Sequence, residues 1–167
     1  MKTLYLVRHA KSSWKKPELS DHDRPLNRRG KKDAPKIGKL LRERGDIPDL
    51  IITSPAKRAF STAIRIAGEL GYPPKKILKN GDLYMADDRE FFSVIAGVKS
   101  KVKKLMLFGH NYGITFFANH ITSMNIPNIP TSGVVRIDFD IKKWKDIQDT
   151  KGKLIYFEYP KKTGDGV

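Results

Sequence analysis

Three motifs in this sequence place histidine or arginine directly after a short apolar run. Arg8-His9 follows the first run, Ser54-Pro55-Ala56-Lys57-Arg58 the second and Gly109-His110-Asn111 the third. Guanidinium groups stay charged and grip phosphate oxygens with two parallel hydrogen bonds. A neutral imidazole can attack phosphorus and form a covalent phosphoenzyme. These residue types therefore indicate phosphoryl-transfer chemistry, provided that the fold brings the three motifs together.

The apolar runs are typical of strands that alternate with amphipathic helices. Strands are expected over residues 2–7, 50–53, 77–78, 104–108, 134–141 and 154–159, and helices over 27–44, 54–70, 87–98 and from beyond 111 to 124. This order favours an α/β fold, a three-layer sandwich with a largely parallel central sheet. In such sheets ligands bind beyond the carboxyl ends of the strands, which is where all three motifs fall.

Local signals predict where these elements begin and end. Asn27 is expected to cap the first helix and Gly45 to stop it. Ser54 is expected as the N-cap of the second helix, with Pro55 in its first position. The charged stretch 142–152 is typical of a turn. The length fits a single domain over residues 1–160, with 161–167 as a frayed tail.

Four motifs resemble those of the histidine phosphatase superfamily, also called the phosphoglycerate mutase-like family. Residues 6–10 are similar to its Arg-His-Gly signature, with Ala10 in place of glycine, and residues 53–63 to its Ser-Pro-x-x-Arg-Ala-x-x-Thr-Ala motif. Residues 108–111 resemble its Gly-His strand end, and residues 24–30 its Arg-Pro-Leu-Thr-x-x-Gly. The short chain further resembles the SixA-like phosphohistidine phosphatase branch. The resemblance implies a phosphoglycerate mutase-like fold.

The resemblance also implies roles for individual residues. His9 is the expected nucleophile, Arg8 and Arg58 bind the phosphoryl oxygens, and His110 stabilises them in the transition state. The other residues expected at the pocket are Arg24, Asn111 and Ser12 as substrate contacts. No metal or other cofactor is expected. The implied enzyme hydrolyses a phosphoric monoester or a phosphoramidate.

The general acid is the least defined part of the site. Residues 82–86, Asp-Leu-Tyr-Met-Ala, lack the glutamate that serves larger family members as acid, and Asp21 or Asp23 is a possible substitute. An alkoxide leaving group needs such an acid, whose help is worth roughly 10²–10⁴-fold in rate. Phosphohistidine leaves as imidazole, a better leaving group. The missing glutamate therefore favours phosphohistidine in a protein as substrate, with a small phosphorylated metabolite as the alternative.

Composition excludes some functions and leaves others open. The chain has no cysteine, which excludes disulfides and thiolate chemistry. It has no long apolar segment, so no membrane partner is expected and the cytoplasm is the predicted location. The formal net charge of +15 favours anionic partners. A basic nucleic-acid-binding module is a more distant alternative, because the lysines are spread along the chain and no nucleic-acid motif occurs.

Overall fold

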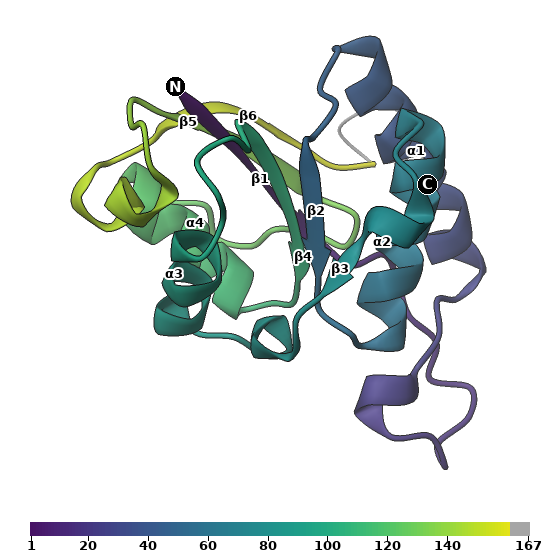
Figure 1. Ribbon diagram of the computed structural model, residues 1–167. Helices are drawn as coiled ribbons and strands as arrows, with labels where there is room; N and C mark the ends of the chain where they lie inside the picture. The colour runs from purple at the N-terminus through teal and green to yellow at the C-terminus, as the bar shows by residue number, and fades with distance from the viewer. Residues whose placement is uncertain (161–167) are drawn as a thin grey trace.

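The computed structural model describes residues 1–160, in which six strands form one sheet with helices on both faces (Figure 1). The strands lie in the order β3-β2-β4-β1-β5-β6, and the first four of these are mutually parallel. β5 runs antiparallel to β1, and β6 runs antiparallel to β5. The predicted three-layer sandwich with a largely parallel sheet is therefore confirmed. The strands are β1 Lys2–Arg8, β2 Leu50–Thr53, β3 Leu78–Lys79, β4 Lys104–Gly109, β5 Val134–Phe139 and β6 Lys153–Glu158.

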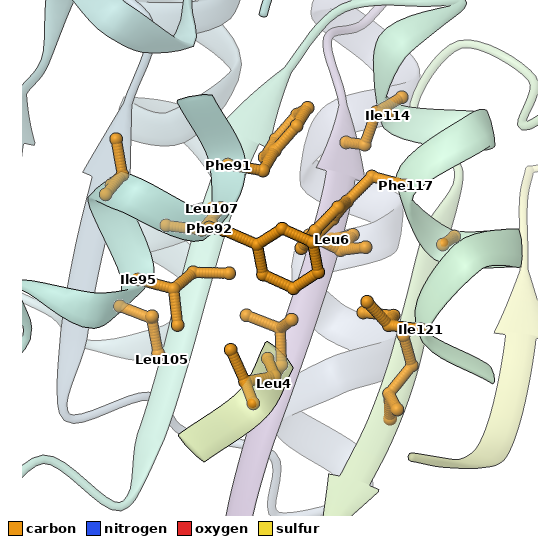
Figure 2. Packing of buried hydrophobic residues seen from close by; sticks show 14 of the residues in the cluster. Leu4, Leu6, Phe91, Phe92, Ile95, Leu105, Leu107, Ile114, Phe117 and Ile121 are labelled. Carbon is orange, nitrogen blue, oxygen red and sulfur yellow. The ribbon is translucent and has the colours of Figure 1, made fainter. Parts of the chain in front are cut away.

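Alternating side chains of the strands divide the core into two halves. Tyr5 and Val7 pack with α1 (Arg28–Glu43) and α2 (Lys57–Leu70) on one face. Leu4 and Leu6 point to the other face, where α3 (Asp88–Ala96) and α4 (Gly113–Thr122) cover the sheet. Figure 2 shows this second half, in which Phe91 and Phe117 stack with ring centroids 4.7 Å apart. Burial on both faces fixes the central strands, and with them the position of the residues at their ends.

The long polar segment after β1 is tied back to the start of α1. Asn27 caps this helix as predicted, because its side chain accepts a hydrogen bond from the Gly30 N–H at 2.8 Å. The Asn27 N–H in turn donates to the Lys11 carbonyl at 2.9 Å. A Cβ atom at Gly30 would overlap that same carbonyl oxygen, so only glycine permits this approach. Within the segment, Asp21–Asp23 form a short 3₁₀ helix, η1.

The predicted cap of the second helix is wrong. α2 begins at Lys57, three residues after Ser54, and its N-cap is Ala56. The Ser54 hydroxyl instead accepts the Ala56 N–H at 3.2 Å and lies 2.8 Å from a ring nitrogen of His110. A serine before proline can either cap a helix or make a tertiary contact. Here its hydroxyl contacts His110, just after the end of β4.

Two other segments differ from the sequence prediction. α4 ends at Thr122, because Ser123 takes a left-handed conformation with φ 63°. The stretch predicted as a plain turn contains the 3₁₀ helix η4 (Trp144–Asp149). Its Trp144 is fully buried and donates its indole N–H to the Val102 carbonyl at 2.7 Å. This segment therefore closes the core instead of projecting into solvent.

Residues 161–167, predicted as a frayed tail, lie outside the described residues. Within residues 1–160 no helix combines the length and the apolar character needed to cross a bilayer.

Two glycine-to-alanine substitutions test the packing at the start of α1. Alanine normally favours a helix over glycine by about 0.5–1 kcal/mol. At Gly30 we expect the opposite sign, a loss of about 1–3 kcal/mol in the free energy of unfolding, because the new methyl group overlaps Lys11 backbone. At Gly68, inside α2, no neighbouring atom lies within 4 Å of the place that the methyl group would take. Gly68→Ala is the matched control and should stabilise the protein.

Urea unfolding of both variants checks this prediction. A Gly30→Ala protein as stable as Gly68→Ala would show that the segment after β1 is not held against the helix.

Candidate active site

The carboxyl ends of β1, β2 and β4 meet at one edge of the sheet and surround a cavity of about 270 Å³. Every residue predicted for the site from the sequence lines this cavity, except Asp23, the alternative to Asp21 as a possible acid. Side chains from the segment after β1 form the opposite wall. The predicted residues found there are Arg8, His9, Ser12, Asp21, Arg24, Arg58, His110 and Asn111.

His9 is buried at the centre of this arrangement, with 7% of its surface exposed. Its Nδ1 lies 2.7 Å from the Ala10 carbonyl oxygen, which can only accept, so Nδ1 carries the proton of the neutral ring. The lone pair is therefore on Nε2. Burial lowers the pKa of His9 to about 3, and the charges of Arg58, Arg8 and Arg24 act in the same direction. His9 is thus a neutral imidazole with a free electron pair at neutral pH.

A second buried histidine lies beside the first. The ring centroids of His9 and His110 are 5.3 Å apart. Burial lowers the pKa of His110 to about 3 as well, with His9 and Arg58 as further causes. Its Nε2 lies 2.8 Å from the Ser54 hydroxyl, while its buried Nδ1 has no partner among the described residues. One ring nitrogen of His110 therefore has an unmet hydrogen-bonding capacity.

Three arginines reach the cavity, and each is held by oxygen atoms. Arg8 donates to the Ile129 carbonyl at 2.9 Å. Arg58 donates to both the carbonyl and the carboxylate of Asp21, at 2.6 and 2.9 Å. Arg24 donates to the Ser12 hydroxyl at 2.7 Å. The Nε atoms of Arg8 and Arg58 are buried without a partner among the described residues. The cavity therefore combines fixed positive charge with unsatisfied donors.

Asp21 does not fit the role of general acid that the sequence suggested. Its carboxylate accepts hydrogen bonds from Tyr84 at 2.6 Å, from Arg58 at 2.9 Å and from Arg24 at 3.3 Å. The bond from Tyr84, followed by those from the arginines, lowers the pKa of Asp21 to about 2. A carboxyl group that is ionised throughout the neutral range has no proton to donate. Asp21 instead binds the guanidinium groups of Arg58 and Arg24 as an anion.

Four further residues surround the site. Asn111 was predicted as a substrate contact, whereas Ser54, Thr62 and Tyr84 were given no catalytic role from the sequence. Asn111 bonds to Asn128 and to the Ile129 carbonyl, which connects it to the partner of Arg8. Thr62 accepts the Ala10 N–H at 2.9 Å and so holds the His9–Ala10 peptide, next to the Ala10 carbonyl that sets the His9 tautomer. Ser54 and Tyr84 were missed because their contacts, with His110 and Asp21, join segments distant in sequence. The Thr62 position was visible in the motif at residues 53–63.

Comparison with known proteins identifies the family of this chain. The model of the histidine phosphatase superfamily (branch 1) matches residues 4–80. The crystal structure of the putative phosphohistidine phosphatase SixA from Agrobacterium tumefaciens is 30% identical in sequence. It aligns with a TM-score of 0.81 over 95% of this chain and 98% of that chain. The chain belongs to the histidine phosphatase superfamily. Its place in the SixA-like branch, predicted from the small size of the chain, is confirmed as well.

Two further proteins, one similar in sequence and one in fold, resemble this chain. An uncharacterised chloroplastic protein of Arabidopsis thaliana is 31% identical over 74% of this chain, which spans 60% of that protein's length. A mycobacterial glucosyl-3-phosphoglycerate phosphatase solved with VO₃ has a TM-score of 0.71 over 95% of this chain and all of that one. At 12% identity this likeness concerns the fold alone, which confirms the phosphoglycerate mutase-like architecture. The superfamily match and the 30% identical neighbour, a putative phosphohistidine phosphatase, support the predicted hydrolase class.

The protonation state of His9 can be measured directly. With its pKa lowered from 6.5 to about 3, His9 should stay neutral as the pH falls through 6.5, the region where an ordinary histidine gains its proton. We expect ¹⁵N NMR of the imidazole nitrogens to show one neutral tautomer, with the proton on Nδ1, down to about pH 5. A histidine-containing peptide is the control. A His9 resonance that titrates near 6.5 would contradict the buried, neutral nucleophile.

The variant Asp21→Asn tests whether this carboxylate is an acid or a competing anion. Asp21 is half-exposed, so removing its charge should tighten tungstate binding only about two- to fivefold. Turnover of a phosphate monoester, whose alkoxide leaving group needs a proton, should change less than about threefold, whereas loss of a general acid costs roughly 10²–10⁴-fold. Asp23→Asn is the matched control, since Asp23 lies in the same short helix and pairs with His22. A collapse of kcat in Asp21→Asn alone would restore Asp21 as the acid.

Proposed function

We propose that this chain is a phosphatase that forms a phosphohistidine on His9 and that its substrate is phosphohistidine carried by another protein. One observation carries the proposal most directly. Among the described residues five buried side-chain nitrogen or oxygen atoms lack a partner, and three of them belong to Arg8, Arg58 and His110 around the cavity. Unpaired buried donors are costly, so the site favours a ligand with several acceptor oxygens and negative charge.

The proposed reaction uses the unprotonated Nε2 of His9. Its Nε2 lone pair attacks phosphorus, the bond from phosphorus to the leaving imidazole breaks, and the phosphoryl group resides on His9. Arg8, Arg58 and Arg24 neutralise the equatorial oxygens, where charge is spread in the transition state. His110 donates to the same oxygens through its ring. Water then attacks the phosphorus of phospho-His9, releasing inorganic phosphate and restoring the free imidazole.

The lack of an acid in the resting site supports a P–N substrate. Asp21, the nearest carboxyl, is ionised and engaged by arginines. Imidazole departs readily and can take its proton from solvent, so no buried acid is needed. The 30% identical neighbour described as a phosphohistidine phosphatase supports the same class of substrate. The cytoplasm remains the predicted compartment.

A small phosphorylated metabolite is the second candidate. It is favoured by one specific observation, the fold shared with a glucosyl-3-phosphoglycerate phosphatase. Such a substrate leaves as an alkoxide and would need a proton donor at the cavity. Asp21 could serve only if substrate binding displaced it from Arg58 and raised its pKa. The two candidates share His9 and differ in the leaving group.

Competing substrates separate the two candidates. Wild-type protein should hydrolyse a phosphohistidine-bearing protein at a clearly higher kcat/KM than a panel of phosphate monoesters, without added metal. His9→Ala should abolish turnover of every substrate with the fold intact. Arg58→Ala should lower kcat by about 10²–10³-fold, since it removes transition-state charge stabilisation. His120→Gln is the control, because His120 is a half-exposed residue paired with Asp88 and lies outside the cavity.

Each alternative result has a definite meaning. Preference for a monoester would keep His9 as nucleophile and assign the enzyme to small metabolites. Full activity in His9→Ala would overturn the mechanism. Nucleic-acid binding that survives His9→Ala and weakens steeply with salt would favour the distant alternative.

A further inference from the structure

A second hollow adjoins the catalytic cavity and is largely apolar. It measures about 570 Å³ and is walled by Met85, Tyr112 and Phe116. Met85 and Asn111 line both this groove and the catalytic cavity, so the two hollows share a wall. Anything bound at His9 by its phosphoryl group therefore has the groove beside it.

The walls of this groove expose large apolar side chains. Met85, Tyr112 and Phe116 are 58%, 62% and 63% exposed. The rings of Tyr112 and Phe116 stack at a centroid distance of 6.1 Å, one turn apart at the start of α4. Contiguous exposed aromatic and methionine side chains are typical of surfaces that bind proteins.

The backbone holds this surface in place from both sides. Met85 has a left-handed conformation with φ 54°, which is unfavourable for a residue with a side chain. Gly113 abuts the Ala86 carbonyl so closely that a Cβ atom there would overlap it. The segment of Met85 and the first turn of α4 are therefore packed together. Strain of this kind is retained where surrounding structure enforces it, and it is frequent at functional sites.

The rim of the groove carries the carboxylates of Asp87 and Asp88 and the guanidinium of Arg89. Asp87 lies 3.9 Å from Arg89, and both side chains are largely exposed. Asp88 contacts the ring of His120 at 2.6 Å. The groove itself thus offers apolar contact without a surplus of positive charge, and the long-range attraction for an acidic partner comes from the net charge of +15 of the whole chain. A surplus of this size steers acidic partners toward the protein and repels basic ones.

We propose that this groove docks the substrate protein, an acidic protein with apolar side chains beside its phosphohistidine. The inference rests on the proposed function and deepens it. A phosphohistidine on a folded protein brings its neighbouring side chains to the rim of the cavity, where Tyr112 and Phe116 lie. A phosphorylated metabolite held in the 270 Å³ cavity would leave these residues uncovered.

Two serine variants test the docking surface. Phe116→Ser and Tyr112→Ser should each raise the KM for a phosphorylated acidic phosphotransfer domain at least tenfold, because aromatic residues dominate protein interfaces. The kcat/KM for phosphoramidate, which reaches only the cavity, should stay within about twofold of wild type. Ile155→Ser is the matched control, since Ile155 is 41% exposed on β6 and lines neither hollow.

The outcomes distinguish docking from the proposed function. Unchanged KM in both variants overturns the docking surface and leaves the phosphatase assignment standing. Equal losses on both substrates show that the residues support the cavity itself, which also overturns docking. A dimer seen by sedimentation in wild type and lost in Phe116→Ser identifies a second copy as the occupant instead. A wild-type protein that is active on phosphoramidate but not on the phosphodomain overturns both proposals.

Discussion

Three guanidinium groups and a buried imidazole share one small cavity, and the rest of the site depends on how their charge is compensated. Like charges repel strongly where water is scarce. Among the described residues, carbonyl oxygens, a hydroxyl group and a single carboxylate accept hydrogen bonds from Arg8, Arg24 and Arg58. The three positive groups therefore outnumber the one anion at the cavity. A phosphoryl group restores the balance, so the resting site is already arranged for its ligand.

The same imbalance keeps His9, the proposed nucleophile, in its neutral form. Burial and the arginine charges all disfavour the protonated form of His9, so the charges that attract phosphate also preserve the lone pair that the proposed mechanism uses. The tautomer is fixed separately, through the Ala10 carbonyl. Because Thr62 of α2 accepts the Ala10 N–H, the helix after β2 holds the backbone that follows β1. Nucleophile, anion binding and helix packing are thus one connected arrangement.

The sequence predicted the positions of the site residues better than their contacts. Local periodicity and the rule that ligands bind at strand ends were enough to place Arg8, His9 and His110 at one edge of the sheet. Contacts between distant segments have no such local signal. Ser54 was assigned to a helix cap, yet its hydroxyl faces His110 across two strand ends. Trp144 likewise looked like part of a charged turn, although its ring fills the core.

The segment after the third strand, which carries the acid in larger family members, has a different composition in this chain. In the larger members a glutamate follows the third strand, whereas here residues 82–86 place Tyr84 and Met85 at that point. Tyr84 donates to Asp21 and stabilises its ionised form. Met85 lines both the cavity and the groove. The absent glutamate and the exposed apolar wall therefore fall within the same few residues. Both features suit phosphohistidine on a protein as substrate. Its imidazole leaves without a proton donor, and the protein that carries it can contact the apolar wall.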